Sequence, residues 1–143
     1  MFVGKHDRQL DPKGRLAIPA EYVKQLGGSD GERKLVIAPG KAGCIWLVTL
    51  KHWEEKFEDF ANAYTSAIPG EFYHLCQERD VDKAGRILID EKARELAHLA
   101  DPSGGEAVPV IVAGTGRYIQ IWRKDTYESR ASSPGAFAQA VRP

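Results

Sequence analysis

The chain has 143 residues, of which 43% are hydrophobic and 28% are charged, as in a globular protein of one compact domain or two small half-domains sharing a core. Its 20 basic and 20 acidic residues give a formal net charge of zero, which argues against binding nucleic acid by bulk charge but leaves room for a local basic surface. No apolar run approaches the roughly 20 residues of a membrane span, and the N-terminus lacks the apolar core of a secretion signal. We therefore expect a cytoplasmic protein without a membrane partner.

The first half of the chain reads as short strands with one short helix. Its β-rich runs are brief and bounded by glycine and proline, which is typical of a small, mainly β domain. The expected strands are residues 3–10, 15–18, 34–38 and 45–49, and the expected helix is 21–26.

A longer helix follows. Trp53, Phe57, Phe60 and Tyr64 recur at spacings of four, three and four, which makes one apolar stripe on a helix of about three turns. Such a stripe is more often core or subunit interface than a site for another partner. We expect both, with Trp53, Phe57 and Phe60 at or under subunit contacts.

The second half repeats the first. Residues 11–18 (DPKGRLAI) match residues 82–89 (DKAGRILI) at an offset of 71, with Asp, Gly, Arg and the last Ile coincident. A self-match of this kind is the signature of a repeated structural unit. We expect half-domains over 1–70 and 71–130 and a mobile tail over 131–143. The strands expected in the second copy are 75–81, 86–89, 108–113 and 118–122, with a helix over 91–99.

Each copy places a tight turn at the start of the matched segment. Asp11 at the first turn position, Pro12 at the second and Gly14 at the fourth are favoured in a type I turn, and the Asp carboxylate accepts bonds from amides two residues on. The second copy keeps Asp82 and Gly85. We therefore assign these four Asp and Gly residues a structural role in the turns.

Turn geometry does not explain why each copy also has an arginine directly after the glycine. One such motif alone would be weak evidence, because an arginine at a hairpin tip often does no more than face solvent. Two in matching positions favour a role for the guanidinium, whose planar fork suits phosphates and guanine edges. The candidate DNA-binding residues at or beside the turns are Arg8, Lys13, Arg15, Arg79, Lys83 and Arg86.

No catalytic or metal-binding pattern accompanies the turns. Cys44 and Cys76 are too few for a disulfide scaffold and are expected to be buried thiols. Only His74 and Cys76 stand at a spacing that would suit a metal pair, and no second pair at finger spacing joins them. We therefore expect neither an enzyme nor a metal or cofactor.

Together these features resemble the MraZ family. The matching motifs occur in order over about residues 1–130: the opening Met1-Phe-x-Gly4, the first Asp-Pro-Lys-Gly-Arg-Leu-x-Ile-Pro, the Trp53-Glu54 helix start and the second Asp-Lys-x-Gly-Arg-Ile-Leu-Ile. The resemblance implies a mixed α+β, mainly β fold. It further implies two tandem AbrB-like swapped-hairpin (double-psi-like) half-domains that form a pseudo-twofold barrel flanked by short helices.

The resemblance also implies a function. MraZ-like proteins are ring-forming, nucleoid-associated transcriptional regulators of the division and cell-wall gene cluster, their own promoter included. They bind short repeated elements of double-stranded DNA. Their Asp-x-x-x-Arg signature corresponds to Arg15 and Arg86, with Lys13 and Lys83 beside them. The alternative is a protein-interaction module of the same fold that does not bind DNA.

Two departures from the family pattern distinguish the second copy. Asp90 stands where proline is common; it suits the start of a helix but places a negative charge near the second turn. The segment 71–78 (EFYHLCQE) is also less basic than the family leads us to expect. Both features put an equal DNA role for the second copy in question.

Overall fold

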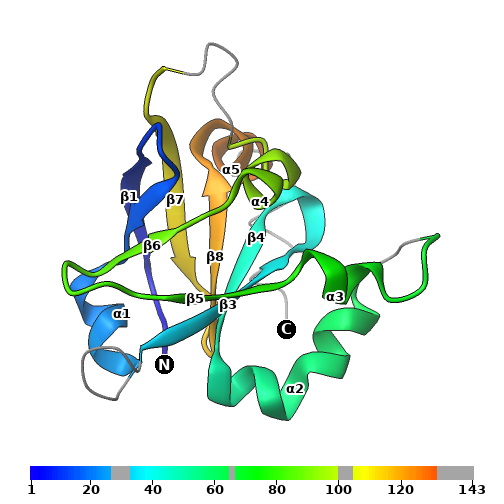
Figure 1. Ribbon diagram of the computed structural model, residues 1–143. Coiled ribbons are helices and arrows are strands. Elements are labelled where there is room, and N and C mark those ends of the chain that lie inside the picture. Colours follow the sequence, from blue (N-terminus) through cyan, green and yellow to red (C-terminus); the bar gives the residue numbers. More distant parts are fainter. Residues whose placement is uncertain (27–32, 65–66, 100–104, 132–143) are drawn as a thin grey trace, which may run out of the picture.

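The computed structural model describes residues 1–26, 33–64, 67–99 and 105–131. Strands predominate in it, with short helices between them (Figure 1). In chain order the elements are β1 (Lys5–Leu10), β2 (Arg15–Ala17), α1 (Ala20–Gln25), β3 (Lys34–Pro39), η1 (Lys41–Gly43), β4 (Ile45–Thr49), α2 (Leu50–Asn62), α3 (Glu71–Leu75), β5 (Gln77–Asp80), β6 (Arg86–Leu88), α4 (Glu91–Leu96), β7 (Val108–Gly114), β8 (Tyr118–Arg123) and α5 (Lys124–Ala131).

The strands form one six-stranded antiparallel sheet, in the order β1-β7-β8-β4-β3-β5, and a separate two-stranded ribbon of β2 and β6. Strands from the two copies pair with one another: β1 with β7, β5 with β3, β4 with β8 and β2 with β6. Exchanging the copies reproduces this pairing, since β1–β7 then becomes β5–β3. The mixed, mainly β class is confirmed. The expected barrel is not found as a closed sheet, because β1 and β5 are the edges of the described sheet.

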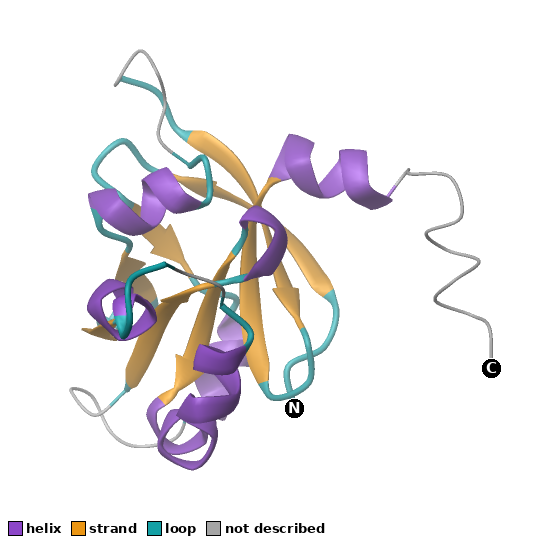
Figure 2. Ribbon diagram, turned by 90° about the vertical axis from the view of Figure 1, so that its right-hand side faces the viewer, coloured by secondary structure: helices purple, strands orange, loops and turns teal. Residues whose placement is uncertain are grey.

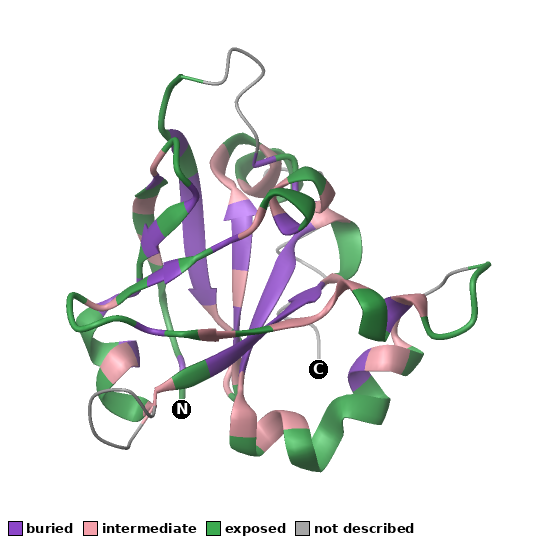
Figure 3. Ribbon diagram, in the orientation of Figure 1, coloured by how far each residue is buried: buried purple, intermediate pink, exposed green. Residues whose placement is uncertain are grey.

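The core is shared between the copies in the same way. Leu10, Leu16 and Ile18 of the first copy are each 5% exposed or less. Their counterparts Val81, Ile87 and Ile89 are buried to the same degree and belong to the same apolar cluster. Figure 3 shows buried residues along the central strands. Because apolar burial is the main drive to fold, each copy completes its core with the other.

Helices α2 and α3 cover a second apolar cluster beside the sheet (Figure 1). Phe60 is buried there, and Trp53 stacks on it with ring centroids 6.0 Å apart. Phe57 is 37% exposed and contacts Tyr73, which is 45% exposed. The aromatic residues expected to form one stripe on this helix therefore have different surroundings. Phe60 and Trp53 belong to the core of the chain, whereas Phe57 lies at its surface.

Two α-helices of the described residues have no counterpart among the elements expected from the sequence. Helix α3 lies where a linker and the start of a strand are expected, so Leu75 is helical and β5 begins only at Gln77; the turn of helix buries Phe72 against the second cluster. Helix α5, seen at the edge of the molecule in Figure 2, continues past Tyr127 to Ala131. The expected tail beyond Ala131 lies outside the described residues. No helix of the described segments is long and apolar enough to cross a membrane.

The helix starts agree in part with expectation. Asp90 caps α4, accepting a hydrogen bond from the Ala93 amide at 2.8 Å. Pro19, a residue type favoured at the first helical position, stands instead at the N-cap of α1, with φ −51° and ψ 135°. Proline has no amide hydrogen and fixes φ near −65°, and both properties are tolerated at this position too.

Candidate nucleic-acid interface

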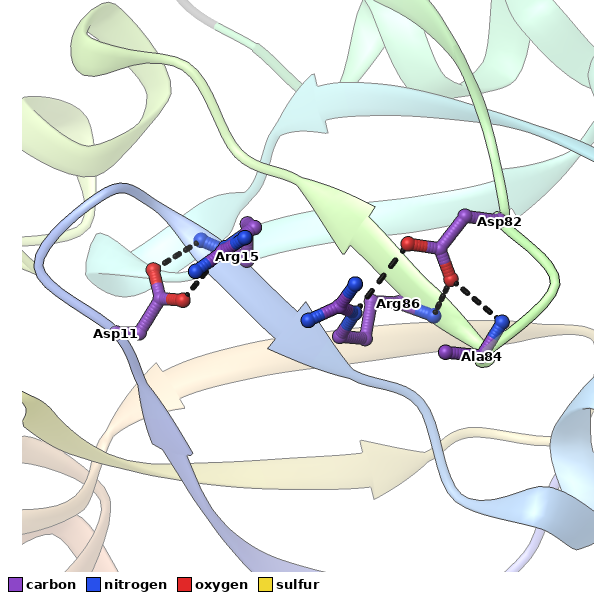
Figure 4. A network of polar contacts seen from close by, with 5 residues as sticks. All are labelled: Asp11, Arg15, Asp82, Ala84 and Arg86. Atoms are coloured by element: carbon purple, nitrogen blue, oxygen red, sulfur yellow. Dashed lines mark hydrogen bonds and ion pairs between the residues drawn. The ribbon is translucent and has the colours of Figure 1, made fainter.

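The two turns have the same hydrogen-bond pattern (Figure 4). In the first, the Gly14 amide donates to the Asp11 carbonyl at 2.9 Å, which closes the expected β-turn. One Asp11 carboxylate oxygen accepts from the amides of Lys13 and Arg15 at 2.9 and 2.8 Å. The other accepts from Arg15 Nε at 2.7 Å. The carboxylate thus fixes both the turn and the base of the arginine side chain.

The second turn repeats each of these bonds. Gly85 donates to the Asp82 carbonyl at 2.9 Å. The Asp82 carboxylate accepts from the amides of Ala84 and Arg86 at 2.9 and 2.8 Å, and from Arg86 Nε at 3.3 Å. The same set of bonds at two positions 71 residues apart follows from the repeated Asp-x-x-Gly-Arg pattern, although the bond from the arginine Nε is longer in the second turn.

Both turn carboxylates are held in their charged form. Burial opposes ionisation of Asp11, but hydrogen bonds from the Arg15 amide and side chain outweigh it and lower the Asp11 pKa. The hydrogen bond from the Arg86 amide is the main cause of the lowered pKa of Asp82. Among the described residues, the hydrogen bonds of both arginines' guanidinium groups use only Nε. The outer nitrogens of two oriented forks are therefore available to a ligand.

The ribbon of β2 and β6 presents both arginines on one face. Its register places Arg15 opposite Leu88 and Ala17 opposite Arg86, and these four residues are exposed, whereas Leu16 and Ile87 between them are buried. Arg15 and Arg86 are diagonal neighbours across the ribbon, a relation that separates residues by about 7–8 Å. Figure 4 shows the two turns at opposite ends of the ribbon.

Each turn is also anchored by the other copy. The Ile18 amide donates to the Gly85 carbonyl at 2.8 Å, and the Ile89 amide donates to the Gly14 carbonyl at 2.7 Å. These reciprocal bonds extend the ribbon pairing to both turns. The relative position of Arg15 and Arg86 therefore follows from the pairing of the two copies.

The other candidate residues lie around the ribbon or away from it. Lys13 and Lys83 are exposed at the turn tips. Arg8 and Arg79 are half-buried on β1 and β5, at opposite edges of the large sheet. The structure thus brings Arg15 and Arg86 together, and it keeps the two edge-strand arginines apart.

Sequence reasoning missed a cation beside the first turn. Arg94 of α4 lies so close to Gly14 that a Cβ on the glycine would be 3.2 Å from Arg94 Nε. At the offset of 71, the first copy has Val23 in place of Arg94. The repeat therefore carried no signal that would have singled out this residue.

The two turn glycines give a matched pair for testing stability. Gly14 has φ +89° and Gly85 has φ +77°, so alanine at either position is expected to cost about 1–2 kcal/mol for the left-handed backbone. At Gly14 a Cβ would also lie 2.6 Å from the Ile89 carbonyl oxygen, whereas at Gly85 the nearest atom is 3.6 Å away. We expect Gly14→Ala to lower the free energy of unfolding by roughly 1–3 kcal/mol more than Gly85→Ala. Urea unfolding of both variants measures the difference, and equal losses would contradict the crowding at Gly14.

The described residues hold no group of three or more His, Cys, Asp or Glu side chains that would suit a metal ion. Cys44 is buried and Cys76 half-buried, and both are free thiols. Burial raises the pKa of each thiol to about 12, so both stay protonated and unreactive near neutral pH.

Comparisons with known proteins identify the family of the chain. The family model described as "MraZ protein, putative antitoxin-like" matches residues 1–69. The transcriptional regulator MraZ of Pelotomaculum thermopropionicum is 33% identical over 133 residues, a match that covers 90% of this chain and 83% of that protein. The MraZ regulators of Moorella thermoacetica (31% identity; 90% of this chain and 85% of that protein) and Carboxydothermus hydrogenoformans (29%; 99% and 94%) are similar over comparable lengths. With both copies covered by these relatives, the chain belongs to the MraZ family.

Proposed function

We propose that this protein is a transcriptional regulator that binds specific double-stranded DNA through the ribbon of β2 and β6. The observation that carries the proposal is the pair of oriented arginines, Arg15 and Arg86, on one exposed ribbon face. The major groove of B-DNA is about 12 Å wide and admits a two-stranded ribbon, and arginine forks bind guanine edges there. Arg15 and Arg86 would read bases, and Lys13 and Lys83 would hold the flanking phosphates.

The targets we propose follow from the family. The relatives compared above are named transcriptional regulators, and the resemblance implies the division and cell-wall gene cluster, the protein's own promoter included. Such a protein works at the nucleoid in the cytoplasm. We further propose that the division at residues 70/71 separates two AbrB-like half-domains. The exchange of strand partners between the copies supports a swapped-hairpin arrangement.

We also propose that the protein acts as a closed ring larger than a dimer. Each subunit offers few cations to DNA, and the chain has zero net charge, so one ribbon alone is expected to bind in the non-specific range of about 10⁻⁴–10⁻⁶ M. Several ribbons engaging one DNA add factors of about 10²–10⁴ through avidity. The exposed Phe57, beside Tyr73, lies on the surface that we assign to subunit contacts.

The dependence of binding on salt tests the function. Lys and Arg on phosphates release counterions, and each phosphate contact contributes about −0.9 to the slope of log affinity against log salt. If Lys13 and Lys83 hold phosphates, changing both to glutamine makes the slope shallower by about 1.8 per engaged subunit. Lys51→Gln with Lys56→Gln, on α2 away from the ribbon, is the control and leaves the slope unchanged.

Fluorescence anisotropy of labelled upstream DNA, with a shuffled sequence alongside, measures this slope. Binding that does not weaken as salt rises would contradict the proposed function. It would instead favour a protein-interaction module without DNA binding.

A further inference from the structure

The repeat makes each turn a control for the other, because residues 71 apart occupy equivalent places. The turns themselves have matching bonds, but their surroundings differ in charge. We infer that the two turns hold DNA unequally, and that Arg94 is an additional phosphate-binding residue at the first turn. This inference rests on the proposed function and goes beyond it by assigning a new residue and a polarity to the interface.

The first difference is a cation beside one turn and an apolar residue beside the other. Arg94 of the second copy packs against the first turn, with Nε 3.2 Å and Cζ 3.3 Å from the place of a Cβ on Gly14. At the equivalent place beside Gly85, the nearest atom is Cγ2 of Val23 at 3.6 Å. The contact of Gly14 with Arg94 and the contact of Gly85 with Val23 are equivalent, because Arg94 and Val23 occupy the same position of the repeat.

Arg94 is also not neutralised by the protein. Its Nε is buried without a hydrogen-bond partner, and none of the ion pairs recorded among the described residues involves its guanidinium. A buried polar group without a partner destabilises the folded protein. An anion bound by the outer nitrogens of the guanidinium would neutralise the unpaired charge of Arg94, and the phosphate flanking the bases read by Arg15 is an anion of the required kind.

The second difference is an acid, Asp90, that pairs with Arg79, the edge-strand arginine of the second copy. Arg79 Nη2 lies 3.7 Å from an Asp90 carboxylate oxygen and also bonds the Gln77 side chain. Its equivalent, Arg8, donates to the Asp7 carbonyl at 2.8 Å, as Arg79 does to the Glu78 carbonyl at 2.9 Å, but Arg8 has no recorded ion pair among the described residues. The residue equivalent to Asp90 is Pro19, which carries no charge. The Ile89 amide, one residue before Asp90, donates to the Gly14 carbonyl, so this acid lies beside the first turn and not, as expected from the sequence, beside the second. Its recorded ion pair there is with Arg79, which leaves Arg94 as the unpaired cation of the first turn.

The unpaired Arg94 therefore favours the first turn as the stronger phosphate site. Because the turns lie at opposite ends of the ribbon, unequal turns give each subunit a direction along DNA. A subunit of this kind binds its element in one orientation. A ring of such subunits then selects elements that all point the same way.

The test compares variants that swap the residues of the two copies. Arg94→Val gives the first turn the apolar neighbour that Val23 provides at the second turn. We expect the slope of log affinity against log salt to become shallower by about 0.9 per engaged subunit. Arg94→Lys keeps the charge and restores the slope. Val23→Arg, which adds a cation beside the second turn, steepens it.

Asp90→Asn tests the second difference independently, because asparagine also serves as an N-cap. We expect it to release Arg79 and to steepen the slope by about 0.9 per engaged subunit. Thermal unfolding of each variant checks that the fold is retained.

The outcomes separate this inference from the proposed function. If the parent protein binds DNA with a steep slope but Arg94→Val matches it, the inference is wrong and the function stands. If Arg94→Val binds weakly and Arg94→Lys does not recover the slope, Arg94 acts through packing and the inference is again wrong. If the parent protein shows no salt-dependent binding at all, the proposed function itself fails.

Discussion

Replacing Arg15 with alanine is expected to leave the fold intact and to remove most of the sequence-specific binding to DNA. The side chain is 42% exposed, and its recorded partner is the carboxylate of Asp11, so its loss leaves no cavity in the core. A bidentate contact between arginine and a base contributes about 1–3 kcal/mol of discrimination. A ring that engages several elements loses this contribution at each one.

A mobility-shift titration against upstream and shuffled DNA measures the loss. The matched control is Arg117→Ala, which removes an exposed arginine from the connection between β7 and β8 and should bind as the parent does. Arg86→Ala should lose less than Arg15→Ala, since the first turn has the richer cationic surroundings. Parent-like affinity of the Arg15 variant would end the assignment of Arg15 to DNA.

The turns are the part of the fold that the sequence predicts best. Asp at the first turn position and Gly at the fourth specify the turn through local chemistry, and the observed bonds of Asp11 and Asp82 follow that pattern. The period-2 alternation around Leu16 and Ile87 likewise predicts which face of each short strand is buried. These features depend on residues close together in the chain.

The features that the sequence did not predict depend on residues far apart. No local signal specifies that β1 pairs with β7, or that β3 pairs with β5, because that choice is made by the shared core. Arg94 was missed for the same reason: its neighbour, Gly14, lies in the other copy. Helix α5 has almost no apolar face, so it lacks the periodic pattern by which helices are recognised.

Changing the spacing between DNA elements should have the second large effect. Sites on one face of B-DNA recur about every 10 base pairs, and subunits around a ring present their ribbons head to tail. We therefore expect a target of several short direct repeats, spaced about one helical turn apart. Inserting five base pairs between two repeats rotates one of them to the opposite face. The avidity factor of about 10²–10⁴ should then be largely lost.

An insertion of ten base pairs is the matched control, because it returns the repeat to the same face. Binding should recover in part, with the remaining loss reflecting the greater distance that the ring must span. Equal affinity for the parent site and both insertions would show that the ring does not bind its repeats together. Binding of DNA by single ribbons would survive that result.

The most direct measurement asks which surface of the protein touches DNA. A photoreactive benzophenone amino acid is placed at Ala17 or Leu88, the exposed ribbon positions directly opposite Arg86 and Arg15. The control position is Glu58, which is exposed on α2. Irradiation with upstream DNA is expected to cross-link the protein from positions 17 and 88 and not from position 58. Cross-links from position 58 alone, with none from the ribbon in a protein that still binds DNA, would contradict the account.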